Sequence, residues 1–374
     1  MNNPRVAIVY DRVNTFGGAE RVLLNLHELY PDAPLYTSVF DPKGASWAKD
    51  WKVIPSFLQC FSWLRSRHQY LGLFMPLAFE SFDFSQYELV ISVTSEAGKG
   101  IITKPGTKHA CYLLTPTRYL WNKSQEYERD FYAGWHRVFL PLHRLAISYL
   151  RWWDYAAAQR PDLIIPISQA VKQRAQRYYK RKIGPVIYPP LNTKLFNTNA
   201  RTHQHIHRHN FPFSSFYLCV ARLVPYKRID LAIEACNKLK RNLVIVGTGS
   251  DEDHLRQLAG NSPHIAFIGY LTDDHLVEYY QQCTGLLFPG EEDFGLTVLE
   301  AMTMGKPTVT FSGSGHTELV LPNVTGVVFT DQHVDAVVQA IVRVEQQLWN
   351  TENIQHHAHQ FNQAKWKQQW RSIV

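Results

Sequence analysis

Four carboxylates lie close to the point where an expected buried strand is followed by a helix. Three of them, residues 291–293, follow the apolar run 285–288 and precede a helix expected over 296–304. A fourth, Glu300, lies on this helix, which is apolar nearly all round and should be buried. A buried carboxylate needs hydrogen-bond partners, and sugar hydroxyls would supply them. The structural alternative is that the acidic cluster caps the helix and Glu300 is an ordinary buried carboxylate.

Two cations five residues apart lie between another strand and helix. Arg222 follows a strand expected over 216–220, and Lys227 precedes a helix expected over 229–240. A planar guanidinium fork and an ammonium near the positive end of a helix suit a diphosphate. The alternative is a pair of ordinary surface cations.

A pair of glycines opens the first expected helix. Gly17 and Gly18 follow a strand at 5–10 and precede a helix over 19–30. Backbone N–H groups at such a start can approach an anion closely. Taken alone, a tight strand-to-helix turn is the favoured interpretation of the pair.

These residues must be positioned by a large α/β fold. The chain has 374 residues, enough for two domains with ample core. Strands and helices alternate through both halves, which predicts parallel sheets covered by helices. The other expected strands are 88–93, 110–114, 162–167, 243–246, 265–271 and 307–311, and the other helices 135–159, 169–182, 251–259, 273–283, 332–348 and 358–372. The proline-containing segment 186–192 is expected to be the hinge.

Composition indicates the kind of partner and the compartment to expect. The formal net charge of +7 and the pI of about 9.0 favour acidic partners, namely phosphates, nucleic acid or an anionic membrane. The five cysteines lie far apart without a CxxC pair, so they predict buried reduced thiols in a cytosolic protein. We expect no signal peptide and no membrane-spanning run.

The spacing of two of the carboxylates carries a resemblance to a known family. Glu292 and Glu300 are separated by seven residues, with Phe294 and Gly295 following the first. This resembles the E-x7-E signature of retaining nucleotide-sugar glycosyltransferases of family 4, which have the GT-B fold. The Arg-x4-Lys and Gly-Gly-x-Glu elements agree with it in order, so the resemblance covers nearly the whole chain.

A further segment resembles that of a narrower group within this family. Residues 115–121 resemble the His-Thr-Pro-x-Arg-Tyr-x-Trp segment of bacterial mannosyltransferases that build O-antigen-type polysaccharides. The chain departs from the pattern at Leu114, where the family has a histidine near the transferred sugar. His109 should lie at the wrong end of its strand to substitute for it. We therefore predict no catalytic histidine, and Arg118 fits an acceptor or phosphate contact as well as a surface ion pair.

The resemblance implies roles for individual residues. Glu292, Arg222 and Lys227 would be catalytic, with the two cations neutralising the leaving diphosphate and Glu292 holding the donor sugar. Glu300 would bind the ribose. The other implied substrate-binding residues are Gly17, Gly18, Gly269, Tyr270, Leu271, Phe294, Gly295, Leu296 and Thr297.

The resemblance also implies an architecture and an activity. Two Rossmann-like domains would face across a cleft, residues 1–188 binding the acceptor and residues 189–357 the nucleotide sugar, with a helix in 358–374 returning to the first domain. The enzyme would be a metal-independent, retaining hexosyltransferase, moving mannose from GDP-mannose to a saccharide or lipid-linked acceptor in cell-surface polysaccharide synthesis. The alternatives are a UDP-sugar donor, or a catalytically weak sugar-nucleotide-binding protein, which Leu114 favours.

Three other segments are candidates for cofactor or metal sites. Residues 247–249 lack the third glycine of a dinucleotide fingerprint, because position 252 is Glu252, which argues against NAD. Residues 251–253 match an Asp-x-Asp metal motif but fit better as an acidic first helical turn. The alternating histidines of 203–209 lie in a polar loop with no completing ligand. We predict no metal and no cofactor, with the nucleotide sugar as co-substrate.

Basic and aromatic segments predict a peripheral location. Residues 51–79 combine aromatics with Lys52, Arg65 and Arg67 and contain no acid, which fits a lipid surface as well as core packing with a basic edge. The basic helix over 169–182 fits a solvated face or an anionic membrane. No nucleic-acid motif accompanies it, so we predict no nucleic-acid partner. The expected location is the cytoplasm, with peripheral contact at the inner face of the plasma membrane.

Overall fold

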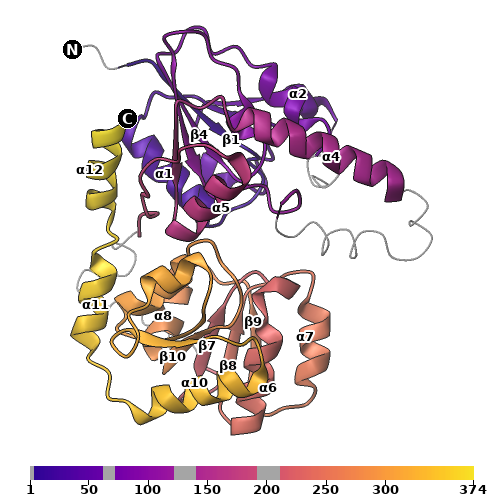
Figure 1. Cartoon of the computed structure of the whole chain (residues 1–374). Coiled ribbons are helices and arrows are strands. Elements are labelled where there is room, and N and C mark those ends of the chain that lie inside the picture. The colour runs from indigo at the N-terminus through magenta and orange to yellow at the C-terminus, as the bar shows by residue number, and fades with distance from the viewer. Residues whose placement is uncertain (1–3, 62–71, 122–139, 192–210) are drawn as a thin grey trace. The chain divides into compact units, whose positions relative to one another are not determined.

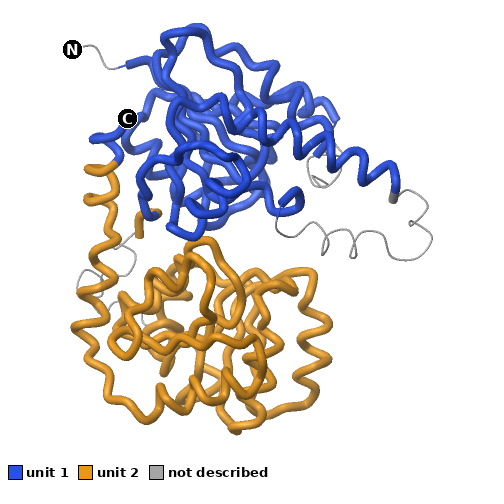
Figure 2. The backbone as a smooth tube through the Cα atoms, viewed as in Figure 1, with its two compact units in different colours: residues 1–188, 370–374 blue, residues 189–369 orange. Residues whose placement is uncertain are grey.

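The computed structural model describes residues 4–61, 72–121, 140–191 and 211–374 (Figure 1). The chain divides into two compact units, coloured separately in Figure 2. Unit 1 consists of Met1–Tyr188 and Trp370–Val374, and unit 2 of Pro189–Gln369. Each unit has its own parallel sheet, as the alternation of strands and helices predicts.

Unit 1 is built on six parallel strands in the order β3-β2-β1-β4-β5-β6. The strands are β1 (Val6–Tyr10), β2 (Leu35–Thr37), β3 (Val53–Pro55), β4 (Leu89–Thr94), β5 (Lys108–Leu113) and β6 (Leu163–Pro166). The central pair, β1 and β4, is buried along its whole length, as apolar strands covered on both faces must be. The strand order reverses between β1 and β4, and ligands of such sheets bind at the carboxyl ends of the strands at this switch point.

The helices of unit 1 follow the sequence pattern closely where it is strong. They are α1 (Gly18–Leu29), α2 (Met75–Glu80), α4 (Leu140–Ala157) and α5 (Gln169–Tyr179), with 3-10 turns η1 (Ser46–Ala48), η2 (Phe57–Cys60) and η5 (Gly98–Gly100). Ser168 caps α5, because its hydroxyl accepts a hydrogen bond from the Val171 N–H at 3.1 Å. This helix ends before the predicted residue 182, since Lys180 takes a left-handed conformation.

Unit 2 repeats the same topology. Its strands are β7 (Tyr217–Val220), β8 (Leu243–Val246), β9 (Ile265–Gly269), β10 (Gly285–Phe288), β11 (Thr308–Phe311) and β12 (Gly326–Phe329), in the order β12-β11-β10-β7-β8-β9. The order reverses between β7 and β10. The switch point of unit 2 therefore lies where Arg222 and the acidic residues 291–293 leave their strands.

Helices cover the sheet of unit 2 and close its core. They are α6 (Ile229–Leu239), α7 (Glu252–Ala259), α8 (Asp273–Gln282), α9 (Leu296–Thr303), α10 (Val334–Gln346) and α11 (Thr351–His359), with 3-10 turns η7 (Pro225–Lys227) and η8 (Gly315–Leu319). The last helix, α12 (Gln363–Ile373), ends in unit 1. Leu231 and Ile233 of α6 and Ile341 of α10 pack with Ile245 of β8 in one buried cluster.

The end of the chain corrects one predicted helix. The expected helix over 358–372 is two helices, since α11 ends at His359 and α12 begins at Gln363. The last residues belong to unit 1, where the Trp370 ring lies 5.5 Å from that of Tyr112. The Lys108 ammonium donates a hydrogen bond to the Ile373 carbonyl at 3.2 Å. The end of α12 is thus fixed to β5 of unit 1.

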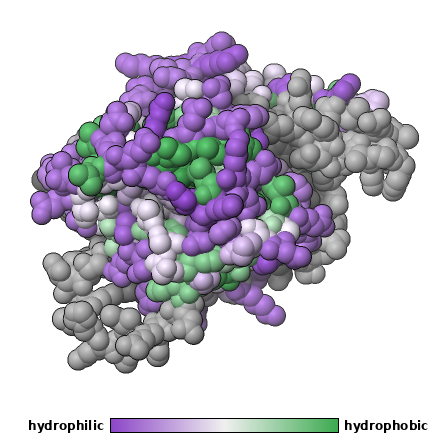
Figure 3. Space-filling model, turned by 90° about the horizontal axis from the view of Figure 1, so that it is seen from below, coloured by the Kyte–Doolittle hydropathy of each residue, from purple (hydrophilic) through white to green (hydrophobic). Residues whose placement is uncertain are grey.

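Other expectations are met in part. Four cysteines are buried as predicted, but Cys60 is exposed, because it ends the surface turn η2. The histidines of 203–209, together with Arg65 and Arg67, lie outside the described residues. None of the helices in the described ranges is long and apolar enough to cross a membrane. The face shown in Figure 3 is largely hydrophilic, with hydrophobic residues gathered near its centre.

Candidate functional site

The carboxyl ends of β7 and β10 bring two predicted residues into contact. The Lys227 ammonium forms a hydrogen-bonded ion pair with the Glu292 carboxylate. The Lys227 side chain is 8% exposed and that of Glu292 is 29% exposed. The pair therefore lies at the switch point of unit 2 with its carboxylate open to solvent, where a polar ligand of this sheet is expected.

Close backbone contact explains why this pair forms. A Cβ atom on Gly290 would lie 2.4 Å from the Lys227 carbonyl oxygen and 2.5 Å from its Cα. Only glycine permits the loops after β7 and β10 to approach this closely. The Glu291 N–H also points to the Tyr226 carbonyl oxygen, at 3.4 Å. The Pro-Gly turn, which the sequence marks only as a strand end, sets the distance between cation and carboxylate.

Tyr226 links the two predicted diphosphate ligands and was missed from the sequence. The exposed Arg222 guanidinium donates a hydrogen bond to the Tyr226 hydroxyl at 3.0 Å. The Lys227 ammonium lies 5.4 Å from the Tyr226 ring and 5.2 Å from the Phe288 ring, which favours a positive charge at this point. An ammonium has three N–H donors, so bonding to Glu292 leaves donors for phosphate oxygens.

A glycine, and no member of the acidic cluster, occupies the N-cap position of the following helix. The N-cap of α9 is Gly295, with φ of 95°, a left-handed conformation that glycine adopts readily. The capping interpretation of residues 291–293 stays a prediction. Glu292 Oε1 accepts a hydrogen bond from the Asp293 N–H at 3.2 Å, which turns the carboxylate back toward its own loop.

His316 supports this turn from the loop after β11, and the sequence did not single it out as a site residue. A Cβ atom on Gly295 would lie 2.6 Å from His316 Cβ, so ring and turn are tightly packed. The His316 Nε2–H donates to the Phe311 carbonyl oxygen at 2.8 Å. Burial lowers the pKa of His316, while the Glu292 charge acts to raise it. His316 thus packs against the turn that leads from Glu292 into α9.

Glu300, which is predicted to bind the ribose, is buried and has a hydrogen-bond partner within the protein. Glu300 is 4% exposed, and its Oε2 accepts a hydrogen bond from the Tyr280 hydroxyl at 2.8 Å. The Thr303 hydroxyl donates to the Glu300 carbonyl oxygen at 2.6 Å. Thr297 and Leu296, one turn earlier on α9, are half-buried. The structural need of this buried carboxylate is thus met by Tyr280, and its ribose contact stays a prediction.

Two other residues predicted to bind the substrate differ in exposure, since Phe294 is buried and Tyr270 is exposed. The Phe294 side chain is 4% exposed and packs against Phe361, with ring centroids 6.4 Å apart, so it serves the core. By contrast, Tyr270 is 73% exposed directly after β9. The Gly269 carbonyl accepts a hydrogen bond from the Gly247 N–H at 2.8 Å, which joins this loop to the one after β8. Tyr270 is therefore free to pack on a base, and the half-buried Leu271 follows it.

In unit 1, the predicted anion site at the start of α1 holds a carboxylate of the chain itself. Gly17 is the N-cap and Gly18 the first residue of α1. Burial raises the pKa of Glu20, and hydrogen bonds from Tyr10 and from the Gly17 backbone act to lower it. The Tyr10 hydroxyl donates to Glu20 Oε1 at 2.6 Å. A donor phosphate at this terminus, which stays a prediction, would have to approach beside Glu20.

Leu114, which stands where the family has a histidine, lies at the carboxyl end of the sheet of unit 1. Leu114 directly follows β5, is half-buried, and its N–H donates to the Thr94 carbonyl oxygen at 2.9 Å. His109 lies at the opposite end of β5, as predicted, where its Nε2 is 2.8 Å from the Ser92 hydroxyl. Burial lowers the pKa of His109 to about 3, so it is a neutral core residue.

The aromatic segment after Leu114 anchors a buried ion pair that the sequence did not predict. The Lys99 ammonium lies 2.6 Å from Asp154 Oδ1, and both side chains are at most 1% exposed. The same carboxylate accepts hydrogen bonds from the Thr117 hydroxyl at 2.9 Å and the Trp121 indole at 2.8 Å. These residues therefore fix the loop after β5 to α4.

The acidic motif at 251–253 behaves as predicted. Glu252 and Asp253 lie in the first turn of α7, and Glu252 accepts hydrogen bonds from Arg256 four residues later. Among the described residues there is no group of three or more histidine, cysteine or carboxylate side chains that could hold a metal ion.

Comparison with known proteins identifies a family that part of the chain matches. Residues 206–363 match the family described as Glycosyl transferases group 1. O-antigen chain mannosyltransferase C of Escherichia coli is 29% identical over 144 residues, covering 37% of this chain and 38% of that protein. The GDP-mannose-dependent alpha-(1-6)-phosphatidylinositol monomannoside mannosyltransferase of Mycobacterium tuberculosis is 31% identical over 143 residues, covering 34% and 37%. The matches thus span well under two thirds of these relatives.

A solved structure extends the likeness to the whole chain. The crystal structure of Anabaena HepE in complex with UDP has a TM-score of 0.70 at 17% identity, covering 98% of both chains. At this identity the likeness shows the fold alone. The two sheets of identical topology and this likeness together identify the GT-B fold.

Proposed function

Residues 206–363 form a group 1 glycosyltransferase domain, and from this premise we propose that the protein is a retaining hexosyltransferase. The observation that carries the proposal is the Lys227–Glu292 pair at the switch point of unit 2. Its cation suits a leaving diphosphate, and its carboxylate, 29% exposed, suits the hydroxyls of the transferred sugar. Arg222 adds a second cation through Tyr226.

The proposed donor is GDP-mannose and the proposed acceptor a saccharide or lipid-linked saccharide of the cell surface. The names of the two mannosyltransferases matched in unit 2 support this choice of donor. A UDP-sugar is the alternative, and the UDP-bound structural neighbour favours it. The exposed Tyr270 beside the switch point would pack on the base of either nucleotide.

In the proposed mechanism the protein supplies charge stabilisation and orientation. Arg222 and Lys227 bind the diphosphate as its negative charge grows, and Glu292 orients the sugar. The leaving phosphate oxygen takes the proton of the attacking acceptor hydroxyl on the same face of the sugar, so configuration is retained. No metal and no cofactor takes part. Because no imidazole is required as base, the mechanism tolerates Leu114.

Donor turnover tests this proposal directly. Purified protein is mixed with a panel of nucleotide sugars, and thermal stabilisation and nucleotide release are measured. A ligand at about one hundred times its dissociation constant stabilises by about 2.7 kcal/mol. We expect stabilisation and slow release with GDP-mannose, both lost in Lys227→Ala and Glu292→Ala. A response to a UDP-sugar alone would replace the donor, and binding without release, even with acceptors added, would favour a sugar-nucleotide-binding protein.

We also propose peripheral contact with an anionic membrane, through the α2–α4 face of unit 1. Exposed apolar side chains lie on these helices or directly before α2, namely Leu73, Phe74, Leu77, Leu142, Leu145, Tyr149 and Trp152. The Trp153 indole donates to Glu80 Oε1 at 2.8 Å and ties α4 to α2, which lie side by side in Figure 1. The acid of α4, Asp154, is buried, whereas Arg144 is exposed. Such a face suits the interface of an anionic bilayer.

Vesicle flotation tests the membrane contact. The protein is mixed with phosphatidylcholine vesicles containing or lacking phosphatidylglycerol. We expect flotation with the anionic vesicles, and its loss in Leu145→Glu and Trp152→Glu. Leu348→Glu, at a 99% exposed leucine of unit 2, is the matched control and should float like the wild type. Equal loss in all three variants would reject the assigned face.

A further inference from the structure

The switch point of unit 1 holds a cation–carboxylate pair that neither the sequence motifs nor the proposed donor site uses. Arg12 follows β1 and Glu96 follows β4, so both leave the carboxyl ends of the central strands. The Arg12 guanidinium donates from Nη2 to Glu96 Oε1 at 2.8 Å and from Nη1 to Oε2 at 3.1 Å. The two side chains are 22% and 17% exposed, so the pair meets solvent at the place where this sheet should bind a ligand.

A buried carboxylate beneath the pair fixes its geometry. Asp11 is 2% exposed and accepts hydrogen bonds from the Thr94 hydroxyl at 2.7 Å and from the backbone N–H groups of Ser95, Glu96 and Gly98 at 2.7, 3.0 and 2.8 Å. The loop after β4 is thus clamped to the loop after β1. The buried Lys99–Asp154 pair holds the end of the same loop on α4. Glu96 is therefore presented on a rigid support, as a binding residue must be.

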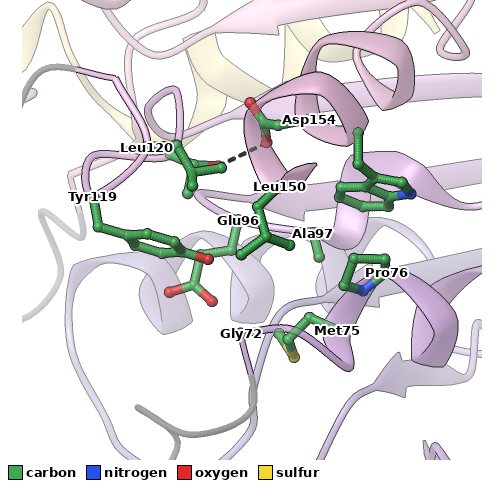
Figure 4. Close-up of a pocket in the computed structure, with 11 residues that line it drawn as sticks. Gly72, Met75, Pro76, Glu96, Ala97, Tyr119, Leu120, Leu150 and Asp154 are labelled. Carbon is green, nitrogen blue, oxygen red and sulfur yellow. Dashed lines mark hydrogen bonds between the residues drawn. The ribbon is translucent and has the colours of Figure 1, made fainter. Parts of the chain in front are cut away.

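A small cavity adjoins Glu96. Its volume of about 10 Å³ is at the lower limit of the space that can hold one water molecule, so it has room for one small polar group at most. Its lining includes Glu96, Tyr119, Thr117 and Asp154, with apolar atoms of Leu150 and other neighbours (Figure 4). Figure 4 shows the Tyr119 ring beside the Glu96 carboxylate. Polar and aromatic groups next to a space of this size suit a sugar hydroxyl.

The charges around Arg12 argue for a neutral ligand. The negative charges of Glu96 and Asp11 both raise the pKa of Arg12 against the effect of burial, so two carboxylates compensate one guanidinium. A phosphate would meet these carboxylates and be repelled. The pair uses two of the five guanidinium N–H donors, and each carboxylate oxygen can accept a second hydrogen bond. Donors beside acceptors match two neighbouring hydroxyl groups, each of which can both accept and donate.

We propose that Arg12 and Glu96 form the acceptor subsite, binding two vicinal hydroxyls of a neutral sugar or cyclitol. The inference rests on the proposed function, because a glycosyltransferase needs a polyhydroxylated acceptor besides its donor. Glu96 accepts a hydrogen bond from one hydroxyl, and Arg12 donates to the other. Tyr119 is a positioning residue beside Glu96. The pair belongs to acceptor recognition and leaves donor affinity to unit 2.

The test separates acceptor use from donor use. Nucleotide release from GDP-mannose, or from the UDP-sugar that proves active, is measured alone and with octyl α-mannoside, octyl glucoside or octyl galactoside. Glu96→Gln should lower kcat/KM for the stimulating glycoside about 10- to 100-fold, the range for a hydrogen bond to a charged group. Release without glycoside and KM for the donor should stay within about twofold of the wild type.

The matched control is Glu345→Gln. Glu345 forms a bidentate pair with Arg241, at 2.7 and 3.1 Å, on the surface of unit 2, so the same chemical change there should leave acceptor use unchanged. Unchanged glycoside stimulation in Glu96→Gln would overturn the subsite. An equal fall of release with and without glycoside would also overturn it, since Glu96 would then act on the donor or on the fold.

A second measurement keeps the inference testable if no nucleotide sugar is turned over. Binding of the octyl glycosides is then followed by saturation-transfer NMR, with phosphate as a competing probe. Wild-type binding that is lost in Glu96→Gln and unaffected by phosphate would support the subsite even though the proposed function had failed. Absence of binding to the wild type, or displacement by phosphate, would overturn it.

Discussion

The two units share one sheet topology, and each places a cation–carboxylate pair at its switch point, yet the pairs differ in what they leave available. In unit 2 the ammonium of Lys227 is nearly buried, while the Glu292 carboxylate is the more open partner. In unit 1 the planar fork of Arg12 is closed on Glu96 by two parallel hydrogen bonds. A point charge with rotatable donors suits a diphosphate, whereas a locked fork offers a fixed donor–acceptor edge.

The supports of the two pairs differ as well. Backbone contact at Gly290 presses the two loops of unit 2 together without a buried charge beneath them. Unit 1 instead uses buried charges, with Asp11 clamping two loops and Lys99 paired with Asp154. The shared topology thus gives both units the same expected place for a ligand, and the side chains at the strand ends favour a different ligand in each. The two units should therefore respond differently to substitution.

The largest expected effect is on the stability of unit 1. Lys99→Met leaves Asp154 charged and buried without its cation, which should lower the free energy of unfolding by about 3–5 kcal/mol. Lys238→Met breaks an exposed pair, with side chains 59% and 58% exposed, and should cost about 0–1 kcal/mol. Urea unfolding followed by circular dichroism measures both. Equal stability of the two variants would contradict the role assigned to the buried pair.

The next effect is on donor turnover and separates the two switch points. Lys227→Ala should lower kcat for nucleotide release about 10²–10³-fold, because one positive charge that stabilises the leaving diphosphate is lost. Arg12→Ala, in the other unit, should leave release without acceptor within about threefold of the wild type. Initial rates at saturating donor measure the difference. If both variants lose release equally, the division of donor and acceptor chemistry between the units is wrong.

A smaller effect tests how the pair of unit 2 is built. Gly290→Ala introduces a methyl group into backbone contact and should destabilise unit 2 by about 1–3 kcal/mol, with weaker donor binding as the loops separate. Gly72→Ala is the matched control, since its new Cβ would lie at an ordinary distance of 3.8 Å from the Tyr119 hydroxyl. Thermal melts with and without donor report both quantities. A donor affinity unchanged in Gly290→Ala would show that the close approach is dispensable.

A pH-dependent effect distinguishes the buried histidines of the two units. Burial lowers the pKa of His109 to about 3 from an ordinary value of 6.5, so the unfolded chain binds the proton more readily. Stability from this residue is complete above pH 6.5 and falls as the pH drops toward 3, by at most about 1.4 kcal/mol per pH unit. His109→Gln should flatten the dependence of unfolding free energy on pH between 4 and 6.5, without changing turnover. An unchanged slope would contradict the assignment.

His316 should behave differently from His109 because it packs beside the candidate site. Its pKa is also lowered by burial, but its ring contacts the turn that carries Glu292. A substitution there is expected to change donor binding, whereas one at His109 is not. The two histidines thus distinguish a purely structural position, at His109, from a position next to the candidate site, at His316.

Much of the architecture follows from the sequence. Apolar runs such as 285–288 predict their strands because both faces of a parallel sheet are buried, and the helical pattern of α6 and α9 gives their bounds within a residue or two. The strands β2, β3 and β12 were not predicted, and β2 and β3 have only three residues each, too few to show a pattern. The break between α11 and α12 was missed because His359 and Asn362 both fit a continuous helix.

For the candidate site, residue types and spacing determined the chemistry, and tertiary contacts decided the partners. Arg222 and Lys227 could be named from the sequence because charge next to a strand end or a helix start has local causes, whereas Glu292 was named from its spacing to Glu300 through the resemblance to the family. That Lys227 pairs with Glu292, Glu300 with Tyr280, and Arg12 with Glu96 depends on strand order, which brings together segments up to 84 residues apart. Strand order is set by packing of the whole sheet, so no local pattern encodes it.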